Sequence, residues 1–425
     1  MNFVKELEWR GLLKDIMPGT EDELDTGSTT GYIGFDPTAS SLTVGNLVTV
    51  MLLVHFQRAG HKPIALVGGA TGMIGDPSGK DKERQLLDED TLNENVRSIK
   101  VQLEKFLDFK SGDNKAVMIN NYDFYKGMDI FEFFRDIGKH LTVSYMISKD
   151  SVKNRLEGGM SFTEFSYQLF QGYDFLWLFK NKNCLLQMGG SDQWGNITSG
   201  TELIRRKEEG KAYALTCPLL TKSDGTKFGK SDEGNIWLDP KRTSPYKFYQ
   251  FWLNASDEDA SKYIRIFSTK TKEEIERVEQ EQAEAPHLRV LQRTLAEEIT
   301  IRVHSEKDLK TAITASEILF GKGTAEALKE LTEESLLDIF EGVPQSNIAK
   351  SDIEIGVGIV EFLTDKTEVL ASKSEARRSI SGGGISVNKT KIESEDYKVD
   401  SKDLLSNKYI LIQKGKKNYH LVTVS

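Results

Sequence analysis

Residues 30–68 of this chain read as a strand, a helix and a second strand. The segment TGYIGF at residues 30–35 is rich in β-forming residues, and residues 41–59 carry apolar residues at helical spacing. IALVG at residues 64–68 is typical of a buried parallel strand. A βαβ unit of this kind predicts a doubly wound α/β domain with a parallel, Rossmann-like sheet. Further strands are expected at residues 117–119 and 185–188, with a helical stretch at residues 129–137 between them.

The rest of the 425 residues is predicted to add two smaller parts. Residues 254–340 turn acidic and helical, with breaks at Pro286, Ser305 and Gly321. We therefore expect four sections. A catalytic domain at residues 1–222, with a dimer-forming insertion after about residue 121, is followed by a lysine loop and α-helical domain at residues 223–341. A polar linker at residues 342–352 then leads to a small α+β module at residues 353–425.

Composition excludes several classes of protein. The apolar run at residues 47–56 is too short to cross a bilayer, and the charged N-terminus lacks the apolar core of a signal peptide, so we expect a cytoplasmic protein with no membrane partner. Cys184 and Cys217 stand in apolar runs, which favours buried reduced thiols and leaves a disulfide open. The six histidines are scattered, so no protein-bound metal site is expected.

A glycine-rich loop, GGATGMIGDPSGK at residues 68–80, follows the second predicted strand. Loops at the carboxyl ends of parallel strands form the ligand crevice of open α/β sheets. The glycine spacing differs from the dinucleotide fingerprint, and no Ser or Thr follows Lys80 as a P-loop requires. The loop therefore argues against a dehydrogenase and against a P-loop NTPase.

Two further segments could bind phosphate. SLTVGN at residues 41–46, just after GFDPT at residues 34–38, opens the first helix, where free backbone N–H groups and the helix dipole attract anions. Lys227 and Lys230 flank a glycine in SDGTKFGKSDEG. That loop is either a solvated surface or a clamp that places two cations on a polyphosphate.

A third segment suggests a substrate pocket. Ser161 and Glu164 form a capping-box pattern, which predicts a helix from about residue 162. Tyr167, Gln171 and Asp174 are then spaced i, i+4, i+7 and share one face. Three polar groups on an aromatic and apolar helix indicate a pocket wall, with an outward-facing polar stripe as the alternative.

In these segments the chain resembles the bacterial tyrosyl-tRNA synthetases, from about residue 30 to residue 320. Besides the motifs above, the resemblance rests on SFTEFSYQLFQGYDFL at residues 161–176 and QMGGSDQWGNIT at residues 187–198. TVGN at residues 43–46 stands at the first signature of class I synthetases (HIGH), and KFGKS at residues 227–231 stands at the second (KMSKS). The family usually has His where this chain has Thr43, and a threonine cannot carry charge.

The resemblance implies activation of L-tyrosine with ATP, release of pyrophosphate, and transfer of tyrosine to tRNA(Tyr) by a homodimer. Magnesium would be carried on the ATP phosphates. The tyrosine carboxylate is already ionised, so catalysis must come from positioning and from neutralising charge on the leaving pyrophosphate.

The resemblance also implies a role for individual residues. The tyrosine-binding residues would be Tyr32, Gly34, Asp36, Asp76, Asn121, Tyr167, Gln171, Asp174 and Gln193, with Tyr32 and Asp174 on the phenol hydroxyl. The ATP-binding residues would be Thr38, Gly45, Asp192, Lys230 and Ser231. The catalytic residues would be Thr43, Asn46, Lys80, Arg84, Lys227 and Lys230.

The C-terminal module carries a basic segment. Residues 373–391 hold five basic residues and one acidic residue in a chain of net charge −9. An Ala-Arg-Arg helix, a glycine turn and a Val-Asn strand resemble the small RNA-binding fold of ribosomal proteins and pseudouridine synthases. This resemblance implies that Arg377, Arg378, Lys389 and Lys391 bind tRNA, and the alternative is a solvated basic surface.

Two other functions are compatible with parts of the sequence. A tryptophanyl-tRNA synthetase is disfavoured by Tyr32 together with Asp174 and by the C-terminal module. A synthetase-derived RNA-binding protein without catalysis is favoured slightly by Thr43 and disfavoured by the intact lysine loop. ATP–pyrophosphate exchange with tyrosine, with tryptophan and with no amino acid distinguishes the three.

Overall fold

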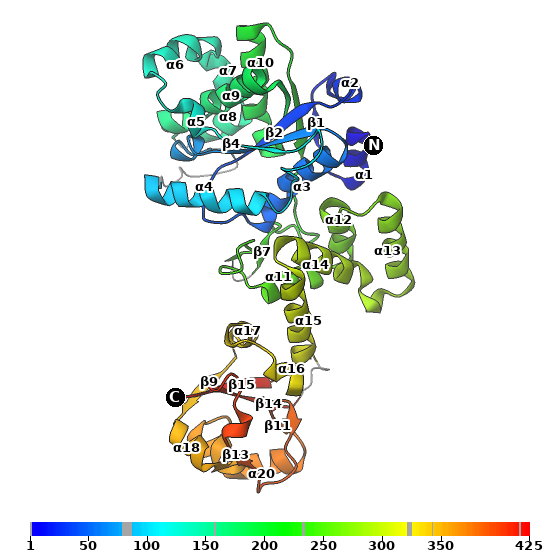
Figure 1. Cartoon of the computed structure of the whole chain (residues 1–425), viewed down its shortest axis with the longest axis vertical. Coiled ribbons are helices and arrows are strands. Elements are labelled where there is room, and N and C mark those ends of the chain that lie inside the picture. The colour runs from blue at the N-terminus through cyan, green and yellow to red at the C-terminus, as the bar shows by residue number, and fades with distance from the viewer. Residues whose placement is uncertain are drawn as a thin grey trace. The chain divides into compact units, whose positions relative to one another are not determined.

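The computed structural model describes residues 2–78, 87–156, 159–231, 234–320, 325–341, 343–415 and 418–425. The chain forms two compact units (Figure 1). The first comprises Met1–Thr243 and Phe251–Val303, and the second comprises Ser244–Gln250 and His304–Ser425. None of the helices in the described ranges combines the length and the apolar character needed to cross a bilayer.

A six-stranded sheet forms the centre of the first unit, and it confirms the predicted α/β class. The βαβ unit at its middle consists of β2 (Thr30–Phe35), α3 (Val44–Arg58) and β3 (Lys62–Val67). The strand order is β1-β6-β5-β2-β3-β4, and every strand is parallel to its neighbours except β1. The other strands are β1 (Asp15–Ile16), β4 (Val117–Asn120), β5 (Cys184–Gly190) and β6 (Tyr213–Cys217).

The order of the strands places the ligand crevice. From β2 the chain adds β3 and then β4 on one side, and afterwards β5 and β6 on the other side. The strand order therefore reverses between β2 and β5, and crevices in open α/β sheets form at such a reversal, beyond the carboxyl ends of the strands.

The predicted pocket-wall helix is α9 (Phe162–Lys182). Ser161 caps it, because its hydroxyl accepts a hydrogen bond from the Glu164 backbone N–H at 3.2 Å. The Glu164 carboxylate pairs with Arg155 at 2.9 Å in the interior. Asn183 ends the helix in the left-handed conformation, with φ of 50°.

Three helices complete the first unit and confirm the helical pattern after residue 254. They are α12 (Asp257–Phe267), α13 (Lys272–Glu284) and α14 (Val290–Val303). A buried set of Ala260, Ile264, Ile275 and Leu291 holds them together. This is the apolar face that the 3.6-residue period predicts.

The second unit differs from the predicted domain boundaries. Its helices α15 (Glu306–Phe320), α16 (Ala325–Lys329) and α17 (Glu333–Ile339) belong with the C-terminal module. Leu336 and Phe340 share one buried cluster with Leu411 and Leu421 of the C-terminal sheet. The predicted α-helical domain at residues 223–341 is therefore divided after residue 303.

The predicted linker at residues 342–352 is also wrong, because most of it is ordered secondary structure. β9 (Gln345–Ile348) pairs with β15 (Asn418–Val424) at the edge of a sheet of order β12-β11-β14-β15-β9, and α18 (Lys350–Ile355) follows it. Backbone hydrogen bonds and Ile348 hold this strand, while its other side chains are polar. A short polar edge strand has the composition of a linker, which explains the error.

The remaining elements of the module surround a second buried cluster. The sheet is completed by β11 (Ile385–Val387), β12 (Thr390–Lys391) and β14 (Tyr409–Lys414). Helix α20 (Lys373–Ser381) buries Ala376 and Ile380 against it. A helix, a glycine turn and a strand follow one another here as the sequence predicted.

Candidate active site

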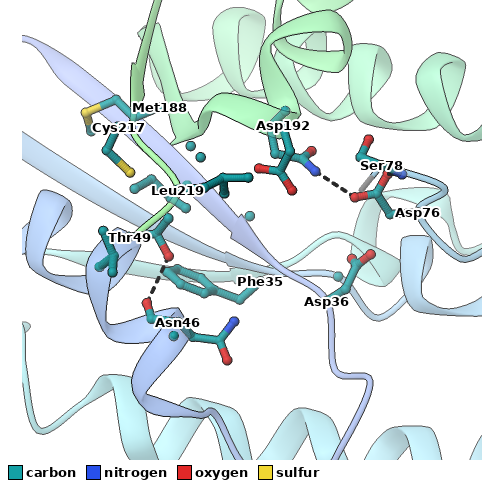
Figure 2. Close-up of a pocket in the computed structure, with 18 of the residues that line it drawn as sticks. Phe35, Asp36, Asn46, Thr49, Asp76, Ser78, Met188, Asp192, Cys217 and Leu219 are labelled. Carbon is teal, nitrogen blue, oxygen red and sulfur yellow. Dashed lines mark hydrogen bonds between the residues drawn. The ribbon is translucent and has the colours of Figure 1, made fainter. Parts of the chain in front are cut away.

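A cavity of about 530 Å³ lies at the carboxyl ends of β2 and β5, where the strand order reverses (Figure 2). Its wall is built from five separate parts of the chain: the end of β2 with the start of α3, the glycine loop, α9, the end of β5 with the segment after it, and the segment from the end of β6 to the lysine loop. Most of the residues predicted for substrate binding line it. They are Tyr32, Gly34, Asp36, Thr38, Gly45, Asn46, Asp76, Tyr167, Gln171, Asp174, Asp192, Gln193 and Lys227.

Four of the residues that line the cavity have a buried oxygen without a partner among the described residues. The hydroxyl of Tyr32 and Oδ1 of Asp174 are sealed from solvent and accept or donate no hydrogen bond within the described part of the chain. Gln171 Oε1 and Gln187 Oε1 are also buried and have no hydrogen-bond partner among the described residues. An unpaired buried polar atom costs about 1–3 kcal/mol, so four around one cavity indicate that a polar ligand supplies the missing partners.

Burial controls the ionisation of Asp174 and Tyr32. It raises the pKa of the Asp174 carboxyl well above its usual range, although a hydrogen bond from Asn121 Nδ2 at 3.0 Å opposes the effect. Burial and the nearby Asp174 also raise the pKa of the Tyr32 hydroxyl. Both groups therefore favour their neutral, hydrogen-bonding forms.

A hydrogen-bonded chain connects Asp174 to Asp36 at the end of β2. Asn121 Nδ2 donates to Thr71 Oγ1 at 3.0 Å, and the Thr71 hydroxyl donates to Asp36 Oδ1 at 2.7 Å. The other oxygen of Asp36 accepts from the Tyr167 hydroxyl at 2.7 Å. Gly68 makes this contact possible, because a Cβ at that position would lie 2.1 Å from Asp36 Oδ1.

Asp76 is held in a second polar cluster (Figure 2). Gln193 Nε2 donates to its Oδ2 at 2.7 Å, and the Ser78 backbone N–H donates to its Oδ1 at 3.0 Å. Asn196, which is fully buried on α10 (Trp194–Glu208), donates to the same Oδ1 at 3.3 Å. This carboxylate is therefore fixed at the cavity wall by three hydrogen-bond donors.

The two signature segments lie side by side. The Val44 N–H donates to the Ile236 carbonyl at 3.0 Å, and the Leu238 N–H donates to the Leu42 carbonyl at 2.9 Å. These bonds tie the start of α3 to the segment just after the lysine loop. Lys227 consequently lines the same cavity as Gly45 and Asn46.

Thr43 acts as the N-cap of α3. Its N–H and its hydroxyl both lie 2.9 Å from Asn46 Oδ1 and donate to it. Leu42, Gly45 and Asn46 line the cavity, whereas Thr43 stands outside its lining. The pair therefore orients the Asn46 amide, and the Thr43 side chain serves the helix end.

Several predicted residues are placed elsewhere or not described. Asn121 contacts the site through Asp174 and Thr71 rather than by lining the cavity. Lys230 begins β7 (Lys230–Ser231) with an exposed side chain, and Ser231 follows it in the same strand. Lys80 and Arg84 lie outside the described residues.

The four basic residues predicted for tRNA are in different environments. Arg378 and Lys391 are exposed. Arg377 lies 3.3 Å from Glu395, and the half-buried Lys389 donates to the Tyr419 hydroxyl at 2.5 Å. Burial lowers the pKa of Lys389. Arg378 and Lys391 are therefore the two of this set that are best placed to meet a phosphate.

Three residues of the site were not predicted. Gln187 pairs with Tyr32 across β5 and β2, and its glutamine in the apolar strand CLLQMGG was the available signal. Thr71 bridges Asp36 and Asn121, and Asn196 holds Asp76. Both stand inside segments that the sequence singled out, but no local pattern shows which distant side chain they reach.

Comparison with known proteins shows the relatives of the chain. Residues 24–321 match the family described as tRNA synthetases class I (W and Y), and residues 335–422 match the tyrosine–tRNA ligase C-terminal domain. The tyrosine–tRNA ligase of Cytophaga hutchinsonii is 62% identical over 99% of both chains. That of Porphyromonas gingivalis is 60% identical over 100% of both chains.

Solved structures agree. A C-terminally truncated mitochondrial tyrosyl-tRNA synthetase of Aspergillus nidulans is 31% identical, with a TM-score of 0.68, over 75% of this chain and 94% of that chain. The tryptophanyl-tRNA synthetase of Plasmodium falciparum is 13% identical, with a TM-score of 0.51, over 79% of this chain and 88% of that chain. The second likeness shows the fold alone.

Proposed function

The chain belongs to the tyrosine members of the class I tRNA synthetases, and we propose that its cavity holds the tyrosine phenol between Tyr32 and Asp174. The reaction is activation of L-tyrosine with ATP followed by transfer of tyrosine to tRNA. One observation supports the placement most strongly: the Tyr32 hydroxyl and Asp174 Oδ1 are buried and have no partner among the described residues. A phenol hydroxyl both donates and accepts, so it can satisfy a hydroxyl and a carboxyl oxygen together.

We assign the substrate ammonium group to Tyr167, Gln171 and Asp76. The Tyr167 hydroxyl gives its proton to Asp36, so its oxygen lone pair remains to accept from the ammonium group. Gln171 Oε1 is a buried acceptor on the same face of α9. Asp76 adds negative charge, and its hydrogen bonds fix its orientation.

ATP then occupies the part of the cavity lined by Thr38, Gly45, Asn46 and Asp192. The positive end of the helix dipole at the start of α3 favours its phosphates. In the chemical step a carboxylate oxygen of tyrosine bonds to the α-phosphorus, and the bond to the bridging oxygen of pyrophosphate breaks. Lys227 and Lys230 would neutralise the charge that develops on this leaving group, with magnesium carried on the ATP phosphates.

Lys230→Ala tests the assignment of the loop. The loss of one charged hydrogen bond in the transition state costs about 1.5–3 kcal/mol, which lowers the rate of adenylate formation roughly ten- to a hundredfold. Rapid-quench measurement of tyrosyl-adenylate gives this rate, and equilibrium titration gives tyrosine affinity. Lys241→Ala, at another exposed lysine, is the control. A loss confined to tyrosine affinity would show that Lys230 takes no part in the chemical step.

We also propose a homodimer. Six exposed apolar residues come from neighbouring segments of the chain, and we propose that they form the dimer face: Ile130, Phe131 and Phe134 on α6 (Ile130–Asp136), Val143 and Ile147 on α7 (Val143–Ile147), and Phe162. Phe131 is 80% exposed, and the rings of Phe134 and Phe162 lie 6.5 Å apart. Exposed apolar groups gathered in this way mark interfaces.

Phe131→Asp should convert a dimer to a monomer in sedimentation velocity. Val101→Asp is the control, because Val101 is a 60% exposed apolar residue on α4 (Glu89–Leu103), outside this face. A dimer that survives Phe131→Asp would place the interface elsewhere.

We further propose a cytoplasmic location, which the two buried free cysteines, Cys184 and Cys217, support.

A further inference from the structure

The lysine loop is an ordered hairpin between residues 220 and 229. Thr221 and Lys227 are bridge partners, and the Lys222 N–H donates to the Thr226 carbonyl at 2.9 Å. Thr221 and Phe228 of this hairpin line the cavity, and so does Lys227. The position of its ammonium group therefore depends on what holds the hairpin in place.

Phe228, which stands next to Lys227, is inserted into a box of aromatic side chains. It is 8% exposed although it belongs to a surface loop. Its ring stacks on Phe267 with centroids 5.4 Å apart and an interplanar angle of 22°. Tyr263 lies at 4.8 Å, and Trp252 and Phe251 both lie at 5.8 Å. An aromatic ring is the largest apolar anchor that a short loop can provide.

The other arm of the hairpin is attached through hydrogen bonds. Asp259 Oδ1 accepts from the Ser223 backbone N–H at 2.9 Å, and Oδ2 accepts from the Ser223 hydroxyl at 3.1 Å. Asp259 is 5% exposed. A buried carboxylate that accepts two hydrogen bonds from one residue fixes both its position and its orientation.

The polar attachment, and the Tyr263 and Phe267 side of the aromatic box, come from one face of α12. Asp259, Tyr263 and Phe267 are spaced i, i+4, i+8, so they lie along a single line on the helix surface. The end of α12 is itself held by Arg10, whose guanidinium donates to the carbonyls of Arg265 and Ser268. This face is therefore a rigid support for the loop.

The loop also fits closely against α3. Gly229 has φ of 84°, and a Cβ there would lie 3.0 Å from both the Gly45 nitrogen and Val44 Cγ2. The backbone beside Phe228 thus touches the helix end that lines the cavity. A small displacement of the hairpin would move the lysines relative to that end.

We infer that Phe228 and Asp259 are positioning residues, which seat the lysine loop on α12 so that Lys227 and Lys230 face the leaving pyrophosphate. The inference rests on the role proposed above for the two lysines. Misplacement of charged groups by about 1 Å can lower the rate a hundredfold, so the position of the loop matters as much as the charges that it carries.

Phe228→Ala tests the aromatic attachment. It should lower the rate of adenylate formation about tenfold or more and raise the Kd for MgATP, while tyrosine affinity stays at the wild-type value. Phe228→Met, which keeps a large apolar side chain, should restore most of the rate. Phe3→Ala is the control, because Phe3 is also a buried ring (2% exposed) and packs on Phe56 rather than on the loop. A wild-type rate in Phe228→Ala overturns the inference.

Asp259→Ala tests the polar attachment against a matched control on the same helix. Asp257 also lies in the first turn of α12, and its carboxylate accepts from Gln282 and Gln292 instead of from the loop. Asp259→Ala should slow adenylate formation and speed hydrogen exchange of the loop amides, and Asp257→Ala should do neither. Equal effects of the two changes would mean that only the stability of α12 is involved, which overturns the inference.

A double-mutant comparison separates this inference from the function of the lysines. If Phe228 acts through Lys227 and Lys230, Phe228→Ala should have little further effect on a chain that already carries Lys227→Ala and Lys230→Ala. Full additivity overturns the positioning role and leaves the lysine assignment intact. A wild-type rate in the lysine double variant overturns the lysine assignment itself.

Discussion

Tyr32→Phe removes a single oxygen that the folded protein leaves unpaired. The side chain is 0% exposed, and its hydroxyl has no hydrogen-bond partner in the described ranges of the chain. Its ring packs on Phe175 with centroids 5.4 Å apart, and phenylalanine preserves this contact. The substitution therefore isolates the hydroxyl from the packing of the ring.

The magnitudes have opposite signs for stability and for activity. A buried hydroxyl without a partner costs about 1–3 kcal/mol, so its removal should raise the free energy of unfolding by about 1 kcal/mol or more. The same removal takes one hydrogen bond from bound tyrosine, worth about 0.5–1.5 kcal/mol net. That loss lowers kcat/KM for tyrosine about two- to tenfold.

Urea unfolding and ATP–pyrophosphate exchange measure the two effects on one preparation. The ratio of kcat/KM for tyrosine to that for phenylalanine should fall by the same two- to tenfold factor, since phenylalanine has no hydroxyl to lose. Phe175→Leu, which repacks the neighbouring ring without removing a polar atom, is the control. A variant that is less stable than the wild type, or that keeps the full tyrosine-to-phenylalanine ratio, refutes the assignment of Tyr32 to the phenol.

Three further predictions concern other parts of the molecule. Burial raises the pKa of Asp174, so the folded state favours the protonated carboxyl, and stability is lost as the pH rises from the unfolded carboxyl pKa toward the folded one. Asp174→Asn should therefore stabilise the protein more at pH 8 than at pH 5 in urea unfolding. An equal gain at the two pH values would contradict this. A chain that ends at residue 352 should bind a hydrophobic dye and aggregate more than a chain that ends at residue 303. The longer chain keeps Leu336 and Phe340 but lacks their packing partners Leu411 and Leu421. Both chains should retain exchange activity. Arg378→Ala with Lys391→Ala should flatten the salt dependence of tRNA affinity by about one unit of log–log slope per lost phosphate contact, whereas Lys350→Ala, at an exposed lysine on α18, should leave it unchanged.

Local patterns were sufficient for much of this account. The βαβ unit was visible because strand and helix periods differ, and the face of α9 was visible because Tyr167, Gln171 and Asp174 are spaced one helical turn apart. Tyr32, Asp36 and Asp76 required the family resemblance, because their position at the cavity depends on strand order. Strand order is a property of the whole sheet.

The errors and omissions have a common physical cause. The strand β9 was taken for a linker, since its place in the sheet is determined by pairing with β15, more than seventy residues later in the chain. Gln187 was missed because only the parallel register places it beside Tyr32. Non-local pairing decided each of these cases.

ATP–pyrophosphate exchange by the unmodified protein tests the central claim most directly. The assay compares tyrosine, phenylalanine, tryptophan and no added amino acid, with magnesium present throughout. A cavity closed by the Tyr32 hydroxyl and Asp174 Oδ1 predicts rapid exchange with tyrosine, far slower exchange with phenylalanine, and background levels with tryptophan or without amino acid. Comparable exchange with tyrosine and phenylalanine would show that the two buried oxygens do not bind the phenol hydroxyl, and would contradict the proposed function.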